Sequence, residues 1–239
     1  MPPSPSNLED VYRTAAAVRV AGLTVESSEA VYRAYVEFVI RHAPAGRVVD
    51  IGCGTGWSTH WFANRGYDAT GVDLNPDVFE PPPYDRLRFV PGSGTALPFP
   101  DAAFDAAAAN QCLEYVPDKR RMLDEMIRVV RPGGAISHIV DHRDHNYHAQ
   151  ESISPLNHLR YSDRTWNLIA RPPFSYTNRL LRSDYLALFA TLPLELVYAG
   201  WDPHGEFTIR QQDLDARFRA RPSDDYDALV SHFICIVEK

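Results

Sequence analysis

Three glycines at alternate positions are the first residues in this sequence whose spacing points to chemistry. They are Gly52, Gly54 and Gly56 in the stretch VVDIGCGTGWS, residues 48–58. A strand that runs into glycines and then into a helix exposes backbone N–H groups and lets a ligand approach the main chain closely. The stretch therefore predicts a site for a nucleotide-like cofactor, although the glycines alone do not say which one.

The spacing of these glycines argues against two common phosphate-binding turns. The dinucleotide fingerprint GxGxxG needs its third glycine at the position of Trp57, and a phosphate loop needs Gly-Lys followed by Ser or Thr. Asp50, just ahead of the glycines, would repel a pyrophosphate but suits a ligand that carries an ammonium group. The turn therefore favours a cationic ligand.

Seven apolar segments are typical of β-strands, and helical patterns separate most of them. The expected strands cover 47–51, 67–74, 87–90, 103–110, 135–140, 195–200 and 231–239. The expected helices cover 8–21, 28–42, 57–66, 118–131 and 183–192. Strands that alternate with helices form a parallel sheet covered on both faces, and such sheets bind ligands at the carboxyl ends of their strands. We expect an α/β fold with a doubly wound, mostly parallel, seven-stranded sheet of the Rossmann-like kind.

The chain is expected to form one domain with one long insertion. After residue 141 the alternating pattern stops until about residue 182, yet aromatic residues in this stretch argue against disorder. We expect a disordered tip over 1–7 and a single domain over 8–239. Its parts are N-terminal helices (8–45), a cofactor-binding half (47–141), a lid or substrate insertion after the fifth strand (142–182) and the C-terminal half of the sheet (183–239).

Composition and charge argue against several kinds of binding partner. A net charge of −7 leaves no basic footprint for nucleic acid. The three cysteines have no CxxC spacing, which indicates free thiols in a reducing compartment. No run of about 18 apolar residues predicts a membrane span. We expect a cytoplasmic protein, a monomer or a homodimer.

Further motifs follow the glycine turn in a fixed order. The stretches are GVDLN, FVPGSGTALPFPDAAFDAAAANQCLEYVPD and RMLDEMIRVVRPGG, and with the glycine turn they lie within residues 47–141. In order and spacing the sequence resembles the class I S-adenosylmethionine-dependent methyltransferases. The resemblance is to the small-molecule branch that includes the ubiquinone and menaquinone biosynthesis enzymes.

The resemblance implies S-adenosylmethionine as cofactor, with S-adenosylhomocysteine as product. Asp73 would accept both ribose hydroxyls, Leu74 would cover one adenine face, and Asn110 would lie near the methionyl end. The family commonly has Asp where this chain has Ser93, so Ser93 would accept the adenine amino hydrogen bond with a shorter reach. The implied cofactor-binding residues are Asp50, Gly52, Cys53, Gly54, Asp73, Leu74, Ser93, Gly94, Thr95 and Asn110.

The methyl acceptor is expected to bind beside the fifth strand and the insertion. Methyl transfer from a sulfonium needs alignment above all, and a base only when the nucleophile carries a proton. The candidate bases are His138, Asp141, His142, Asp144, His145, His148, His158 and Tyr161, with Asp141, His142 and Tyr161 preferred. The candidate pocket residues are Glu114, Tyr115, His145 and Trp166. The histidine-rich insertion also suits a divalent ion, but we predict no metal. Oxygen, nitrogen and carbon nucleophiles of a small molecule all stay open.

Two other functions are compatible with parts of this pattern. A non-catalytic scaffold of the same fold could keep the cofactor while binding a partner, and Ser93 in place of Asp favours it modestly. A nucleotide-dependent oxidoreductase is disfavoured by the GxGxG spacing.

Overall fold

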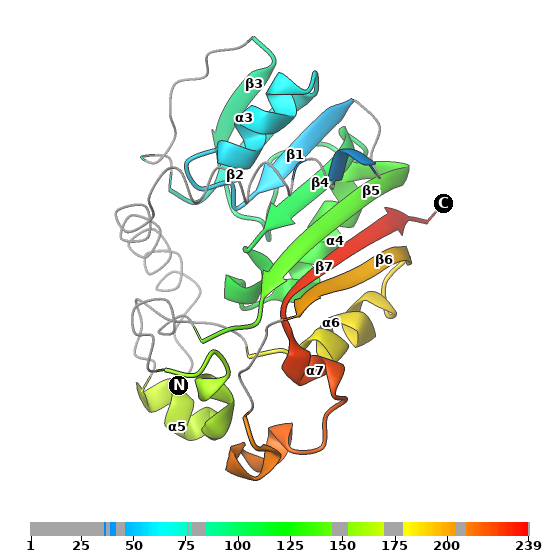
Figure 1. Ribbon diagram of the computed structural model, residues 1–239. Helices are drawn as coiled ribbons and strands as arrows, with labels where there is room; N and C mark the ends of the chain where they lie inside the picture. Colours follow the sequence, from blue (N-terminus) through cyan, green and yellow to red (C-terminus); the bar gives the residue numbers. More distant parts are fainter. Residues whose placement is uncertain are drawn as a thin grey trace.

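A seven-stranded sheet forms the centre of the computed structural model, which describes residues 36, 39–41, 46–75, 77, 85–144, 153–169, 179–203 and 209–238 (Figure 1). The strand order is β3-β2-β1-β4-β5-β7-β6. Only β7 runs antiparallel to its neighbours. The strands are β1 (Arg47–Ile51), β2 (Asp68–Asp73), β3 (Leu87–Pro91), β4 (Phe104–Asn110), β5 (Val130–Asp141), β6 (Leu194–Pro203) and β7 (Ala228–Val237). The expected mostly parallel, seven-stranded α/β sheet is therefore confirmed.

Short helices connect and flank the strands. The α-helices are α3 (Trp57–Asn64), α4 (Lys119–Val129), α5 (Asp163–Ile169), α6 (Arg182–Phe189) and α7 (Asp224–Asp227). The 3-10 helices are η2 (Leu113–Tyr115), η4 (Asn157–Arg160), η5 (Gln211–Asp213) and η6 (Ala216–Phe218). The expected helix over 8–21 lies outside the described residues, as does most of that over 28–42. In the described parts, no helix combines the length and the apolar character that a bilayer crossing requires.

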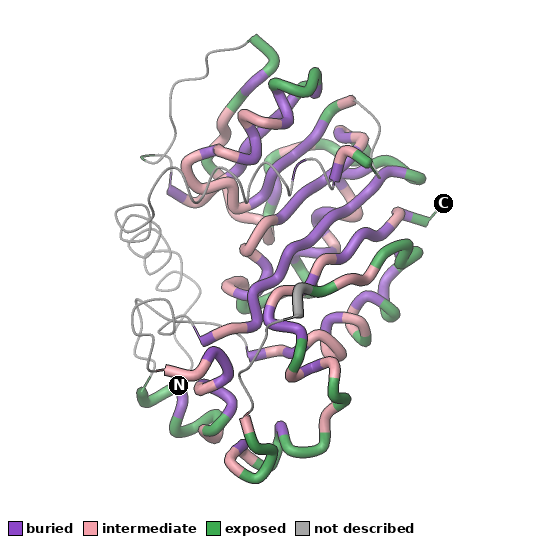
Figure 2. The backbone as a smooth tube through the Cα atoms, in the orientation of Figure 1, coloured by how far each residue is buried: buried purple, intermediate pink, exposed green. Residues whose placement is uncertain are grey.

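Two apolar clusters cover the two faces of the sheet, because alternate residues of each strand point to opposite sides. Ile136 and Val140 of β5 pack in one cluster with side chains of α4 and α6. Ala135 and Ile139 pack in the other with Phe62 of α3. Figure 2 shows the central strands as an almost continuous buried band. The buried sheet fixes where the strand ends lie, and those ends carry the candidate site.

The start of β5 differs from expectation. The sequence predicts a helix to residue 131, the RPGG turn as its end, and a strand from 135, whereas α4 ends at Val129 and β5 begins at Val130. Val130 is paired with Phe104 and Ala135 with Ala106, so the register shifts across RPGG. The strand absorbs these residues as an irregularity in its ladder, and Gly133 with φ +76° permits the bend.

The insertion is more regular than expected. Its described part contains η4 and α5, although this stretch of sequence has no periodic pattern that would predict them. A third apolar cluster joins it to the C-terminal part of the chain through Leu156, Leu159, Leu181, Leu214, Phe218 and Leu229. The insertion is thus packed against the rest of the molecule by its own small core.

Candidate functional site

The glycine turn forms a tight loop between β1 and α3. Gly52 and Cys53 both donate backbone N–H groups to the carbonyl of Val72, at 2.8 and 3.1 Å. Gly52 has φ +70°, and a β-carbon there would collide with the sulfur of Cys112. The backbone is therefore held close to the end of β2, and only glycine fits at its first bend.

Asp73 connects the end of β2 to this turn. Its Oδ2 accepts the Gly54 N–H at 2.9 Å, and its Oδ1 accepts the Asn75 N–H at 3.0 Å. Each carboxylate oxygen has more than one acceptor site, so both oxygens can still accept a ligand hydroxyl. Asp73 and the adjacent Leu74 are partly exposed. The backbone bonds thus hold a charged double acceptor in a fixed orientation beside the glycines.

The turn after β3 lies next to Asp73. The Gly92 N–H donates to the Asp73 carbonyl at 2.9 Å. The hydroxyls of Ser93 and Thr95 lie 2.8 Å apart, and the Thr95 N–H donates to Ser93 Oγ at 3.3 Å. Together with Gly94 they place hydroxyl and backbone groups near the carboxylate.

Asp50 lies under the turn as a buried carboxyl. It is 1% exposed, and Thr59 of α3 donates its hydroxyl to Oδ2 at 2.7 Å. The pKa of Asp50 is raised to about 7: burial is the largest cause, the Thr59 hydrogen bond opposes it, and the nearby Asp73 carboxylate adds to the increase. A nearby cation would favour the ionised form, so this carboxyl can respond to a positively charged ligand.

Asn110 supplies a polar group at the end of β4. Its Nδ2 atom is buried and has no hydrogen-bond partner among the residues that the structure describes. The next residue, Gln111, has φ +48°, and its N–H donates to the Ile139 carbonyl at 2.8 Å. An unpaired buried amide beside a bent backbone suggests a ligand acceptor group, such as a carboxylate, in this position.

These residues fit a cationic nucleoside. Asp50 and Asp73 offer two carboxyl groups, Asn110 offers a donor, and no described atom lies within 4 Å of the point that a β-carbon on Gly54 would occupy. The N–H groups of Gly52, Cys53 and Gly54, expected to be exposed, are instead bonded within the protein. The predicted cofactor-binding residues on β1, β2, β4 and the turn after β3 are thus brought to one edge of the sheet. Thr59 and Cys112 also belong to this edge, and no local sequence pattern indicates this because both contacts depend on the tertiary fold.

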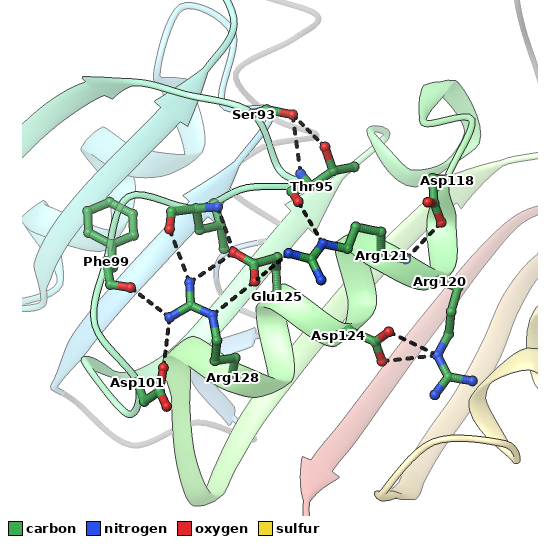
Figure 3. A network of polar contacts seen from close by, with 11 residues as sticks. Ser93, Thr95, Phe99, Asp101, Asp118, Arg120, Arg121, Asp124, Glu125 and Arg128 are labelled. Atoms are coloured by element: carbon green, nitrogen blue, oxygen red, sulfur yellow. Dashed lines mark hydrogen bonds and ion pairs between the residues drawn. The ribbon is translucent and has the colours of Figure 1, made fainter. Parts of the chain in front are cut away.

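A network of polar contacts fixes the segment after Thr95 (Figure 3). Arg128 of α4 donates to the carbonyls of Phe99 and Leu97 at 2.8 and 3.1 Å. It also forms ion pairs of 2.9 Å with Glu125 and Asp101. Glu125 in turn accepts the Leu97 N–H at 2.7 Å. The LPFPD stretch is therefore tied to α4, which positions the turn that carries Ser93.

The residues expected to act as bases are engaged with protein groups. Asp141 accepts two hydrogen bonds from the guanidinium of Arg143, at 2.8 and 2.6 Å. The Nδ1 atom of His142 lies 3.0 Å from the Leu180 carbonyl and Nε2 lies 2.8 Å from Ser231 Oγ. A carbonyl accepts only, so Nδ1 carries the proton and Nε2 of the neutral ring accepts from the serine. This geometry disfavours His142 as the general base.

The other expected acceptor-side residues lie in two places. Glu114 is buried beside the end of β5, where its Oε1 is 3.4 Å from the Asp141 N–H, and Tyr115 follows it in η2. Tyr161 stacks on Trp166 with ring centroids 6.1 Å apart. Trp166 is only 5% exposed, so it mainly packs the interior of the insertion. His145 lies outside the described residues.

Comparisons with known proteins find similarity over part of the chain. Residues 49–137 match the family described as methyltransferase domain. An uncharacterized methyltransferase of Mycobacterium sp. (strain JLS) is 42% identical over 94 residues, 38% of this chain and 37% of the relative. A demethylmenaquinone methyltransferase of Renibacterium salmoninarum is 34% identical over 107 residues, 44% of this chain and 45% of the relative. The match thus spans less than half the length of these relatives.

A solved structure shares the fold over almost the whole chain. It is the 1,6-didemethyltoxoflavin-N1-methyltransferase of Burkholderia thailandensis, with bound 1,6-didemethyltoxoflavin and S-adenosylhomocysteine. The TM-score is 0.65 at 20% identity, covering 99% of this chain and 92% of the other. The shared Rossmann-like fold therefore extends beyond the matched 89 residues (49–137).

Proposed function

We propose that this chain, whose residues 49–137 match the methyltransferase domain family, is a class I S-adenosylmethionine-dependent methyltransferase that transfers a methyl group to a nucleophile of a small molecule. When bound, S-adenosylmethionine supplies a methyl group on a sulfonium, whose leaving group needs no protonation. The protein must therefore bind the cofactor and the acceptor, align them with each other, and exclude water. The observation that carries the proposal is the Asp73 carboxylate, held by the Gly54 N–H at the edge where the glycine turn ends.

Each side chain at this edge has a proposed task in cofactor binding. Asp73 accepts the ribose hydroxyls, Asp50 balances the positive charge, and Asn110 donates to the methionyl carboxylate. Ser93 and Thr95 bind the adenine edge. Gly52, Cys53, Gly54 and Gly94 let the cofactor approach the main chain closely, although the N–H groups of the first three are bonded within the protein. Leu74 contributes an apolar contact.

The acceptor is proposed to bind on the side of β5 and the insertion. Relatives with methyltransferase names act on demethylmenaquinone and on 2-methyl-6-phytyl-1,4-hydroquinone, which supports a small molecule as the acceptor. The proposed acceptor-side residues are Glu114, Tyr115, Asp141, His142, His145, Tyr161 and Trp166. The division into a cofactor-binding half (47–141) and a substrate insertion (142–182), the cytoplasmic location and the monomeric or homodimeric state also remain proposals.

Calorimetric titration with S-adenosylhomocysteine tests the proposal. Asp73→Ala removes two charge-assisted hydrogen bonds, worth about 3 kcal/mol together, so its affinity should fall about 100-fold. Asp68→Ala, at the exposed opposite end of the same strand, is the matched control and should bind as the parent does. Circular dichroism of both variants excludes unfolding as the cause. A parent protein that gives no binding heat would overturn the proposal.

The scaffold alternative predicts a different result. The protein would then bind S-adenosylhomocysteine but methylate none of a broad panel of small molecules, and Asp73→Ala would leave its binding to a partner protein unchanged.

A further inference from the structure

His158 in the insertion is a buried imidazole with an unused nitrogen. The residue is 1% exposed, and its Nδ1 atom has no hydrogen-bond partner among the described residues. Its ring lies against Trp166, with centroids 5.9 Å apart. Burying a polar atom without a partner costs free energy. Such an atom in a candidate site therefore indicates that a ligand forms a hydrogen bond with it or that it takes up a proton.

Several bonds hold His158 in place. Arg179 donates to the backbone carbonyls of His158 and Tyr161, at 2.9 and 2.7 Å, which fixes η4. Asp144 lies beside η4, because its N–H donates to the Pro155 carbonyl at 2.6 Å and its Oδ2 accepts from the Asn157 side chain at 3.0 Å. The imidazole is therefore positioned by its surroundings, although its own Nδ1 is not engaged.

Four charged or titratable groups act on this ring. Asp144 and Asp141 favour the imidazolium, whereas Arg179 and His142 oppose it. Burial is the largest influence and lowers the pKa of His158 to about 4. The ring is thus neutral at neutral pH and offers a lone pair. The Asp144 carboxylate would stabilise the imidazolium that forms when the ring takes a proton.

Contacts and electrostatic interactions lie between the glycine turn and His158. Cys112 packs against Gly52, and Glu114, in the 3-10 helix that follows it, interacts electrostatically with the Cys112 thiol. Glu114 Oε1 faces the Asp141 N–H at the end of β5. Asp141 in turn interacts electrostatically with His158. The hydrogen bonds of Asp144, which follows the end of β5, place η4 and His158 beside that strand end, whereas His138 stacks on Phe189 in the core.

We propose that His158 accepts a hydrogen bond from an acidic hydroxyl or heteroaromatic N–H of the methyl acceptor and takes its proton during methyl transfer. The acceptor oxygen or nitrogen bonds to the methyl carbon while the carbon–sulfur bond breaks and its electron pair stays on sulfur. The proton moves to the imidazole and then to solvent. This inference rests on the proposed function and deepens it.

The chemistry of the ring narrows the acceptor class. A base is required only for a nucleophile that carries a proton, which a thioether or pyridine nitrogen does not. A weakly basic imidazole serves acidic protons best, which favours phenols, enols and heteroaromatic N–H groups over aliphatic alcohols.

Nuclear magnetic resonance tests the contact directly. In protein with labelled histidine rings and saturating S-adenosylhomocysteine, the His158 signals are assigned by their loss in His158→Gln. Titration with 4-nitrocatechol and with benzimidazole should shift these signals and leave those of His138 in place. If neither probe moves the His158 signals while S-adenosylhomocysteine binds, the inference is overturned and the proposed function stands. If S-adenosylhomocysteine does not bind, the proposed function itself fails.

Methylation assays with S-adenosylmethionine test the proton transfer. The expected substrate is 4-nitrocatechol, because the second ring nitrogen of benzimidazole carries no proton and can be methylated without a base. The expected non-substrates are pyridine, thioanisole and cyclohexanol. His158→Gln should lower kcat about 100-fold with KM changed less than about threefold, within the usual range for loss of a general base. His158→Asn provides a second variant if the first does not fold, and His138→Phe is the control for loss of a buried histidine. Methylation of the proton-free probes alone, or of none of the four, or an unchanged kcat in folded His158 variants, would overturn the inference.

Discussion

At the scale of single residues, Asp50 is a carboxyl whose charge depends on what binds above it. With its pKa raised to about 7 by burial, it keeps a proton in about half of the molecules at neutral pH. A cation bound beside it stabilises the carboxylate and lowers this pKa. Cofactor binding and proton release should therefore be linked.

This linkage is measurable by calorimetry in two buffers of different ionisation enthalpy. Binding of S-adenosylmethionine at pH 7 should release a fraction of a proton, and Asp50→Asn should abolish the release. Thr59→Val removes the hydrogen bond that lowers the pKa of Asp50, so its release should persist to higher pH. Equal binding heats in both buffers for the parent protein would contradict this account.

At the scale of elements, Arg128 joins α4 to the LPFPD segment. Its guanidinium donates hydrogen bonds to two backbone carbonyls, which would otherwise bind water, and forms an ion pair with the buried Glu125 (Figure 3). Arg128→Ala leaves these groups without a donor, which should lower the free energy of unfolding by about 2–3 kcal/mol. Urea denaturation measures this loss.

The matched control lies on the same helix. Arg120 pairs with Asp124 at 3.0 Å on the exposed surface, so Arg120→Ala should cost no more than about 0.5 kcal/mol. If the two variants lose equal stability, the network does not hold the segment as described.

Local sequence patterns were sufficient for most elements. The strands β1 to β4 are short apolar runs bounded by turns, and Asp118 marks the start of α4, where it accepts the Arg121 N–H. The position of Asp73 beside the glycines could also be expected, since parallel strands end at the same edge of a sheet. These strands, the start of α4 and the position of Asp73 could therefore be predicted without tertiary information.

The remaining differences come from contacts distant in sequence. His142 was expected to act as a base, but Leu180 and Ser231, 38 and 89 residues away, occupy its ring nitrogens. The RPGG stretch looks like a helix stop, yet pairing of Val130 with Phe104 draws it into β5. None of these three partners could be predicted from local spacing, because the tertiary fold brings each of them into contact.

At the scale of the whole molecule, buried histidines set the stability in acid. Burial lowers the pKa of His138 to about 3 and of His158 to about 4, from about 6.5 in an unfolded chain. Between about pH 4 and 6.5 the unfolded chain therefore binds more protons at these sites, so acid favours unfolding. Asp50 acts in the opposite direction over nearly the same range, because its pKa is raised in the fold.

The two histidines outweigh Asp50, so the free energy of unfolding should fall as pH is lowered from 6.5 to 5. Each uncompensated proton contributes a slope of about 1.4 kcal/mol per pH unit. His138→Phe keeps an aromatic ring against Phe189 and removes one titrating group whose nitrogens have no partner in the described structure. Urea denaturation should show that this variant gains more free energy of unfolding over the parent protein at pH 5 than at pH 8. An equal gain at both pH values would mean that His138 titrates alike in the folded and unfolded chain, contrary to its burial.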